Sequence, residues 1–209
     1  MSSRQVVSKE TLEHVTQQAE FSTVYSVLMA TGGVLAAVAL LTNSIPILVG
    51  SMVVAPAFPP LALIAFALAS RKPSLAFRGL WIAVVGLVLA TLFAMLTTWV
   101  MNVTGVIPPE TNLLNKPLLE ERVSPGWYTV VAAAAGGVAG AVALARKKTD
   151  TLVGVVAALA LVPATGAAGI AILSNDPTRS LGGLALLGIN MGLIVVAGFA
   201  TLLILRPEP

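Results

Sequence analysis

Residues 46–69 read PILVGSMVVAPAFPPLALIAFALA, and the expected architecture follows from the properties of this segment. It has no acidic residue, no basic residue and no histidine. A helix needs roughly 20 apolar residues to cross the hydrocarbon core of a membrane, so the stretch is long enough to span it. Pro56, Pro59 and Pro60 stand in its middle. Because proline removes an N–H donor and clashes with the preceding turn, we expect this helix to break near its centre.

The whole chain has the same apolar character. Of its 209 residues, 57% are hydrophobic and only 10% are charged, and the mean hydropathy is +0.94. A soluble domain carries about 25% charged residues and a disordered chain has low hydrophobicity, so the composition excludes both classes. The uncharged runs predict an all-α polytopic membrane protein with six transmembrane helices, near residues 23–42, 46–69, 79–101, 127–145, 151–173 and 182–205.

The basic residues predict how these helices are oriented. With the N-terminus inside, nine of the twelve basic residues fall on the cytoplasmic side. The cytoplasmic group is Arg4, Lys9, Arg71, Lys72, Arg78, Arg146, Lys147, Lys148 and Arg206, and the outer group is Lys116, Arg122 and Arg179. Since cytoplasmic loops carry an excess of Lys and Arg, we expect a multi-pass protein of the cell (inner) membrane with both termini in the cytoplasm.

The two halves of the chain resemble each other at an offset of 104 residues, without a gap. The matches include Gly32-Gly33-Val34 with Gly136-Gly137-Val138, Leu48-Val49-Gly50 with Leu152-Val153-Gly154, and Pro59 with Pro163. Each unit holds three predicted spans, and an odd number makes the second unit enter the membrane from the opposite side. We therefore predict two inverted three-helix repeats, with the second span of each, spans 2 and 5, broken by proline.

This repeat divides the chain into five predicted segments. They are a cytoplasmic N-terminal helix (1–22), the first three-helix repeat (23–101), an extracytoplasmic linker (102–126), the second three-helix repeat (127–205) and a cytoplasmic tail (206–209). In the N-terminal helix, Leu12, Val15 and Ala19 share one face, which fits a helix leading into the first span and leaves a membrane-surface anchor as the alternative.

Helices interrupted by Gly or Pro at matching places of two repeats are the best sequence indication of a transport site. The candidate pathway or binding residues are Asn43, Gly50, Ser51, Pro56, Pro59, Pro60, Gly154, Pro163, Thr165 and Asn190. Alternatives stay open for several of them. The prolines are also consistent with ordinary packed kinks, Asn190 with a hydrogen bond between helices, and Asn43 with a turn or helix cap. In the outer linker, Glu120 and Arg122 are candidates.

The predicted spans contain no ionisable residue, which argues against proton or sodium coupling through a carboxylate. Neutral side chains and freed carbonyls favour a small neutral solute or a cation. The chain has no cysteine, and its one histidine, His14, lies in the polar N-terminal segment, so we expect no enzyme activity, no metal site and no cofactor. No basic tract alternates with aromatic residues, so we also expect no nucleic-acid partner.

These motifs resemble the prokaryotic membrane-protein family called domain of unknown function 389, over roughly residues 22–205. The similar positions are Gly50, Met52, Pro56 and Pro60 in span 2, Gly154, Val155, Ala157, Leu161 and Pro163 in span 5, Asn190 in span 6, and Glu120, Arg122 and Pro125 in the linker. The chain departs from the family pattern at Pro59, Val123, Thr129 and Ala164. The resemblance implies an architecture and no established activity.

Two functional hypotheses follow from the residues. The first is a small channel or transporter with a pathway at the interface of the two inverted repeats. The alternative is a membrane module that transports nothing and binds lipid or a partner protein. In both cases we expect contact with membrane lipid and assembly into a homo-oligomer.

Overall fold

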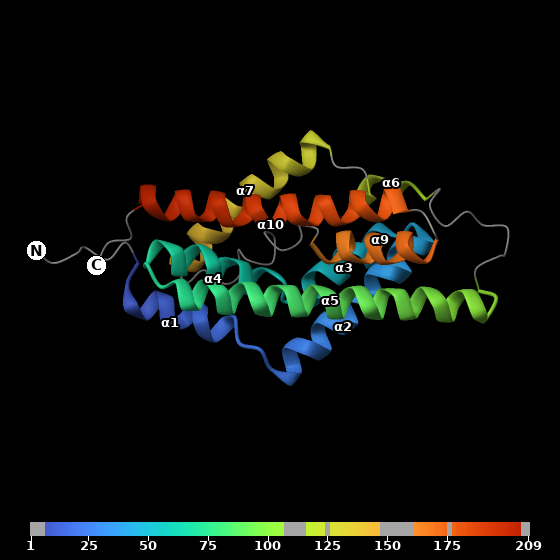
Figure 1. Cartoon of the computed structure of the whole chain (residues 1–209), viewed down its shortest axis with the longest axis horizontal. Helices are drawn as coiled ribbons and strands as arrows, with labels where there is room; N and C mark the ends of the chain where they lie inside the picture. The colour runs from blue at the N-terminus through green and yellow to red at the C-terminus, as the bar shows by residue number, and fades with distance from the viewer. Residues whose placement is uncertain (1–6, 107–115, 124–125, 147–160, 175–176, 206–209) are drawn as a thin grey trace, which may run out of the picture.

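The computed structural model describes residues 7–106, 116–123, 126–146, 161–174 and 177–205, and these residues are helical with no strand among them (Figure 1). The helices are α1 (Lys9–Gln18), α2 (Thr23–Thr42), α3 (Ile45–Val54), α4 (Phe58–Ala69), α5 (Pro73–Val103), α6 (Pro117–Val123), α7 (Trp127–Ala145), α9 (Leu161–Leu173) and α10 (Pro177–Leu205). The predicted all-α class is therefore confirmed for this part of the chain.

Several of these helices have the length and composition of membrane spans. Helices α2, α5, α7 and α10 qualify singly, and α3 with α4 qualifies as one span bent by 49°. Helix α9 is shorter, and residues 151–160, the first part of the predicted fifth span, lie outside the described residues. The described helices thus include four, or with the bent pair five, that could cross a membrane, as in a multi-pass membrane protein.

The ends of the helices follow from local sequence. Helices α2 and α7 begin and end where the apolar runs predict, whereas α5 and α10 begin at Pro73 and Pro177, earlier than predicted. Proline suits the start of a helix because its missing N–H would have no partner there. Helix α2 starts after Ser22, whose hydroxyl accepts a hydrogen bond from the Tyr25 N–H at 3.1 Å, and it ends at Asn43 in the left-handed conformation.

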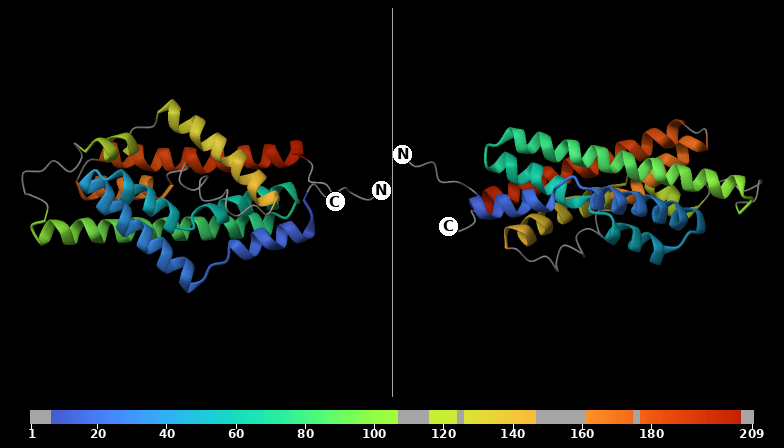
Figure 2. Two further views of the ribbon diagram at one scale, coloured as in Figure 1. Left: turned by 180° about the vertical axis from the view of Figure 1, so that it is seen from behind. Right: turned by 90° about the horizontal axis from the view of Figure 1, so that it is seen from below.

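The long helices α5 and α10 both lie along the length of the molecule and run in opposite directions, and α4 and α9 each pack against both of them (Figure 1). Helices α2 and α7 cross the bundle obliquely on opposite sides of it, a relation that the view from behind also shows (Figure 2). Helix α1, the α4–α5 turn and the end of α10 lie at one end of the molecule. Helix α6 and the start of α10 lie towards the other end.

Glycines permit two close helix crossings. A β-carbon on Gly33 of α2 would collide with the carbonyl oxygen of Ala90 in α5. A β-carbon on Gly137 of α7 would lie 2.7 Å from the carbonyl oxygen of Ile194 in α10. Gly137 stands 104 residues after Gly33, and Ile194 stands 104 residues after Ala90. Small residues of this kind let the backbones of two helices approach each other.

A second pair of contacts shows the same offset. Gly79 of α5 packs against Ile64 of α4, and Gly183 of α10 packs against Ala168 of α9. Each residue of the second contact again stands 104 positions after its match in the first. The contacts between α4 and α5 are therefore repeated between α9 and α10.

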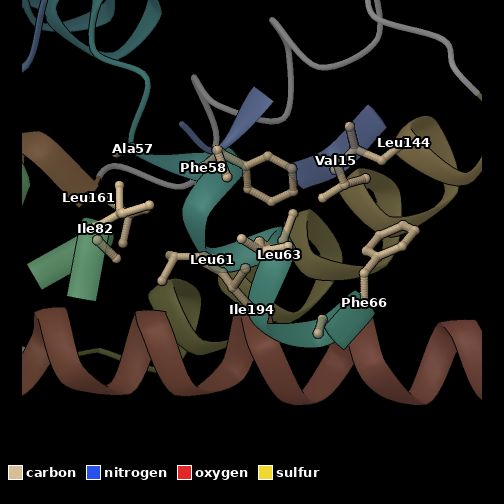
Figure 3. Close-up of a cluster of buried hydrophobic side chains, with 14 of the residues drawn as sticks. Val15, Ala57, Phe58, Leu61, Leu63, Phe66, Ile82, Leu144, Leu161 and Ile194 are labelled. Carbon is tan, nitrogen blue, oxygen red and sulfur yellow. The ribbon is translucent and has the colours of Figure 1, made fainter. Parts of the chain in front are cut away.

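The buried core centres on α4. Its Phe58, Leu61 and Phe66 pack with side chains from α1, α5, α7, α9 and α10 (Figure 3). Those partners include Val15, Ile82, Leu144, Leu161 and Ile194. The apolar face of α1 is thus buried against the bundle, with Leu12, Val15 and Ala19 all inside the protein.

Candidate functional site

The bent span breaks at Ala55-Pro56-Ala57, between the end of α3 and the start of α4. The N–H of Ala57 donates to the carbonyl oxygen of Ala55 at 2.9 Å, which satisfies one of the groups freed by the break. Pro59 and Pro60 lie in the first turn of α4, where a missing N–H removes no helical hydrogen bond. The chain therefore breaks at one place, beside Pro56, and the two later prolines begin the next helix.

Two other helices hold this break. A β-carbon on Gly32 of α2 would lie only 2.6 Å from the Cβ of Ala55, so glycine is needed for this approach. On the other side, the ring of Phe58 fills the space beside Gly140 of α7. Ala55 and Ala57 are buried, and Pro56 is half-buried. The break is thus enclosed between a helix of the first half and a helix of the second half of the chain.

The two buried hydroxyl candidates are bonded within their own helices. Ser51 Oγ donates to the carbonyl oxygen of Leu48 at 2.7 Å, and Thr165 Oγ1 donates to that of Val162 at 2.8 Å. Their protons are therefore occupied, and only oxygen lone pairs remain for another group.

The remaining glycine and proline candidates differ in their surroundings. Pro163 is buried within α9, whereas Gly50 of α3 is half-buried with open space beside its Cα atom. Gly154 lies outside the described residues.

Asn190 is the one candidate in α10 and the most unusual polar group of the site. The residue is 1% exposed, and its Oδ1 has no hydrogen-bond partner within the described part of the chain. Among the described residues, therefore, no helix donates a hydrogen bond to this oxygen. An unpaired acceptor of this kind costs roughly 1–3 kcal/mol, so a ligand or a water that donates to it would be favoured.

The position that stands 104 residues before Asn190 has different surroundings. Gly86 of α5 stands there, and the ring of Tyr25 packs against it. The Tyr25 hydroxyl donates to the carbonyl oxygen of Ile82 at 3.0 Å, so this polar group is satisfied. The first half therefore closes the position with an aromatic side chain, whereas the second half has an amide whose oxygen has no partner among the described residues.

One buried cluster connects the break, α9 and α10. It contains Ala55, Ala57 and Phe58 at the break, Leu161 and Val162 of α9, and Ile194 of α10. Ile194 lies one turn after Asn190 on the buried face of its helix. A cavity of about 10 Å³ lies among Phe58, Gly137, Ile194 and neighbouring side chains, with room for about one water.

Asn43 lies apart from this central group. It is exposed at the end of α2, and its Oδ1 accepts a hydrogen bond from the Leu118 N–H of α6 at 3.2 Å. The cap interpretation of Asn43 is confirmed, and its placement among the pathway residues stays a prediction. A left-handed residue ends the helix, and its amide then reaches the start of another helix.

The outer-loop candidates Glu120 and Arg122 lie on α6, a short helix within the segment that was predicted to be a linker. Leu119 and Val123 are buried, Glu120 is exposed, and the Arg122 side chain is only 17% exposed. Arg122 Nη2 lies 4.0 Å from Glu121 Oε1, and Nε has no hydrogen-bond partner in the described residues. Burial lowers the pKa of the Arg122 guanidinium, and the charge of Glu121 opposes that shift.

Pro117 followed by apolar residues on one face was the available signal for α6. Leu119 and Val123 share a buried cluster with Leu40 of α2, Met52 of α3 and Ile170 of α9. Helix α6 therefore covers one end of the bundle.

The family model for Domain of unknown function (DUF389) matches residues 52–196, more than half of the chain. The chain belongs to the DUF389 family. The match includes the break, the described part of α9 and Asn190, so the most unusual features of the site lie within the DUF389 region. Neither a curated protein nor a solved structure matches the chain.

Proposed function

We propose that this DUF389 protein is a small membrane channel or transporter. Its pathway would run between two inverted three-helix repeats, past the break at Ala55–Ala57 and past Asn190. The observation that carries the proposal is the buried Oδ1 of Asn190, which has no hydrogen-bond partner among the described residues. Ile194, one turn later on the same helix, belongs to the buried cluster that includes the break. Broken helices at a repeat interface are the usual surroundings of a substrate site in transporters built from inverted repeats.

A matched pair of helix crossings and the directions of two helices support the inverted repeat within this proposal. The Gly33–Ala90 crossing of α2 with α5 has a counterpart in the Gly137–Ile194 crossing of α7 with α10. The opposite directions of α5 and α10 fit a second unit that enters the membrane from the other side (Figure 1). In this arrangement, residues 151–173 would be the fifth of six spans, and α3 with α4 would be the second.

The chemistry of Asn190 limits the class of substrate. A neutral amide oxygen accepts a hydrogen bond from an N–H or O–H donor, or coordinates a cation, but it cannot pair with an anion through that atom. The spans have no carboxylate for proton exchange. We therefore propose a small neutral solute with a hydrogen-bond donor, or a monovalent cation, as substrate.

The charges support an orientation for this transporter. Lys9, Arg71, Lys72, Arg78 and Arg146 all lie on or next to helices at the end that α1 occupies (Figure 1). We propose that this end faces the cytoplasm, as the excess of basic residues predicts.

Self-association stays a prediction. Gly188 and Gly192 of α10 are exposed with open space beside them, whereas the positions 104 residues earlier are the exposed Val84 and Val88. Light scattering of the protein in detergent would measure the number of copies.

Flux into liposomes tests the proposed transport. Purified protein should admit potassium, or small solutes such as urea and glycerol, faster than protein-free liposomes do. Asn190→Leu should lower this flux by about tenfold, equivalent to about 1.4 kcal/mol. Asn102→Leu, at an exposed position near the end of α5, is the matched control and should leave the flux unchanged.

Thiol labelling gives an independent readout, since the chain has no native cysteine. Single cysteines at Ala55 and Ala57 should react with a water-soluble thiol reagent in liposomes, although both positions are buried. No flux for any of these solutes, together with complete protection of both cysteines, would favour the module that binds lipid or a partner without transporting.

A further inference from the structure

A second site lies at the end of the molecule that α1 occupies, away from Asn190. A cleft of about 370 Å³ opens between α1 and the turn that joins α4 to α5. Lys9, Leu12, Glu13 and Thr16 line it from α1, and Lys72 and Leu75 line it from the start of α5. Spacings of three and four residues place the α1 contributors on one helix face. The cleft thus has two cationic groups, one carboxylate and two apolar walls.

The charged groups of this cleft are available to a ligand. Lys9, Glu13 and Lys72 are exposed, and none of them forms an ion pair within the described part of the chain. The Thr16 hydroxyl donates to the Leu12 carbonyl oxygen at 2.7 Å, which leaves its oxygen lone pairs facing other partners.

The position of the cleft fits the surface of a membrane. Helix α1 is fixed on the bundle because Val15 and Ala19 are buried. Phe77 and Trp81 are exposed in the first turns of α5, close to the residues that line the cleft. Aromatic side chains are enriched at the level of the lipid headgroups. A phospholipid in the same leaflet could therefore place its headgroup beside Lys72.

We infer that this cleft binds the phosphoethanolamine headgroup of a membrane phospholipid. The phosphate would lie between the ammonium groups of Lys9 and Lys72, and the headgroup ammonium would donate hydrogen bonds to the Glu13 carboxylate. Leu12 and Leu75 would contact the apolar part of the lipid next to the glycerol. This site is separate from the proposed transport pathway and does not depend on it.

Charge complementarity selects this headgroup among common ones. An acidic headgroup without an ammonium group could place its phosphate between the two lysines, but it would leave the Glu13 carboxylate without a donor or a positive partner from the lipid. A choline headgroup carries a positive charge but has no N–H to donate to the carboxylate. Phosphoethanolamine matches both lysines and Glu13.

Native mass spectrometry of the purified full chain in detergent tests this inference. Three phospholipids with identical acyl chains are added, with phosphoethanolamine, phosphoglycerol and phosphocholine headgroups. We expect the phosphoethanolamine lipid to be retained several-fold better than the other two. Soluble O-phosphoethanolamine should reduce its retention, whereas inorganic phosphate at the same concentration should have a smaller effect.

Variants separate the two halves of the headgroup. Lys9→Gln with Lys72→Gln should lower retention of the phosphoethanolamine and phosphoglycerol lipids about tenfold. Glu13→Gln should lower retention of the phosphoethanolamine lipid alone, so that its preference over phosphoglycerol disappears. Arg146→Gln removes an exposed cation from the same end but outside the cleft, and should change neither.

Three outcomes would overturn the inference. They are equal retention of the three lipids by the unmodified chain, an unchanged preference in Glu13→Gln, and a loss in Arg146→Gln as large as that in the double lysine variant. A mass adduct of O-phosphoethanolamine on the chain, without retention of the lipid, would assign the cleft to a free phosphate compound instead. If circular dichroism shows that the double variant is unfolded, the single variant Lys72→Gln and the competition experiment on the unmodified chain decide the question.

Discussion

The helices α2–α5 and α7–α10 share a framework but fill it differently. Gly33 meets Ala90 in the first set as Gly137 meets Ile194 in the second. At the matched positions Gly86 and Asn190, however, one set has a glycine covered by an aromatic ring and the other a buried amide. One glycine crossing in each set therefore stands at matched positions. The sets differ at Asn190, whose Oδ1 has no partner among the described residues.

The largest expected effect comes from the shared crossings. Gly33→Ala and Gly137→Ala should each lower the free energy of unfolding by about 1–3 kcal/mol, because the new methyl group meets a backbone carbonyl in both places. Titration of the purified protein with SDS measures this. Gly188→Ala is the control, since open space surrounds Gly188 and alanine should stabilise its helix by about 0.5–1 kcal/mol. Sensitivity at only one of the two crossings would contradict their equivalence.

The matched polar positions should respond with opposite signs. Asn190→Leu removes a buried acceptor without a partner and should raise the free energy of unfolding by about 1 kcal/mol. Tyr25→Phe removes the bond to the Ile82 carbonyl and should lower it by about 0.6 kcal/mol, the average for such bonds in a membrane protein. The same titration measures both. A loss of stability in Asn190→Leu would indicate that Asn190 has a structural partner, and would weaken its assignment to a pathway.

The link between α2 and α6 allows the effect of a hydrogen bond to be separated from that of backbone conformation. Asn43→Gly keeps the left-handed conformation, at φ 55°, but removes the bond to the Leu118 N–H. We expect about 0.5–1 kcal/mol less stability and faster hydrogen exchange at the Leu118 amide. Asn43→Ala should cost about 1 kcal/mol more, because alanine also strains the backbone there. Equal effects of the two substitutions would show that the left-handed conformation adds no cost of its own and that the lost link to α6 accounts for the change.

The sequence predicted what depends on local composition. Apolar runs located α2 and α7, and Pro56 indicated the break between α3 and α4. The sequence did not predict that Pro59 would lie in the first turn of a helix. A proline can either break a helix or stand at its start, and which of the two occurs depends on where the previous helix ends. Nor did the sequence predict that the Ser51 hydroxyl would bond its own helix, since that depends on the rotamer set by neighbouring helices.

The sequence also did not predict the contacts between segments that lie far apart in the chain. The link from Asn43 to Leu118 joins positions far apart in the chain, and no local pattern indicates it. The cleft beside α1 likewise requires Lys72 to lie near Lys9, which depends on how α1 packs on the bundle. The position of Asn190 on a buried face was predictable from its apolar neighbours, but the lack of a partner for its oxygen was not.

The opposite directions of α5 and α10 also have an electrical consequence. Each helix carries a macrodipole, positive at its N-terminus and negative at its C-terminus. Because the two longest helices point in opposite directions, their dipoles largely cancel (Figure 1). The backbone dipoles of these two helices taken together should therefore interact only weakly with the voltage across the membrane.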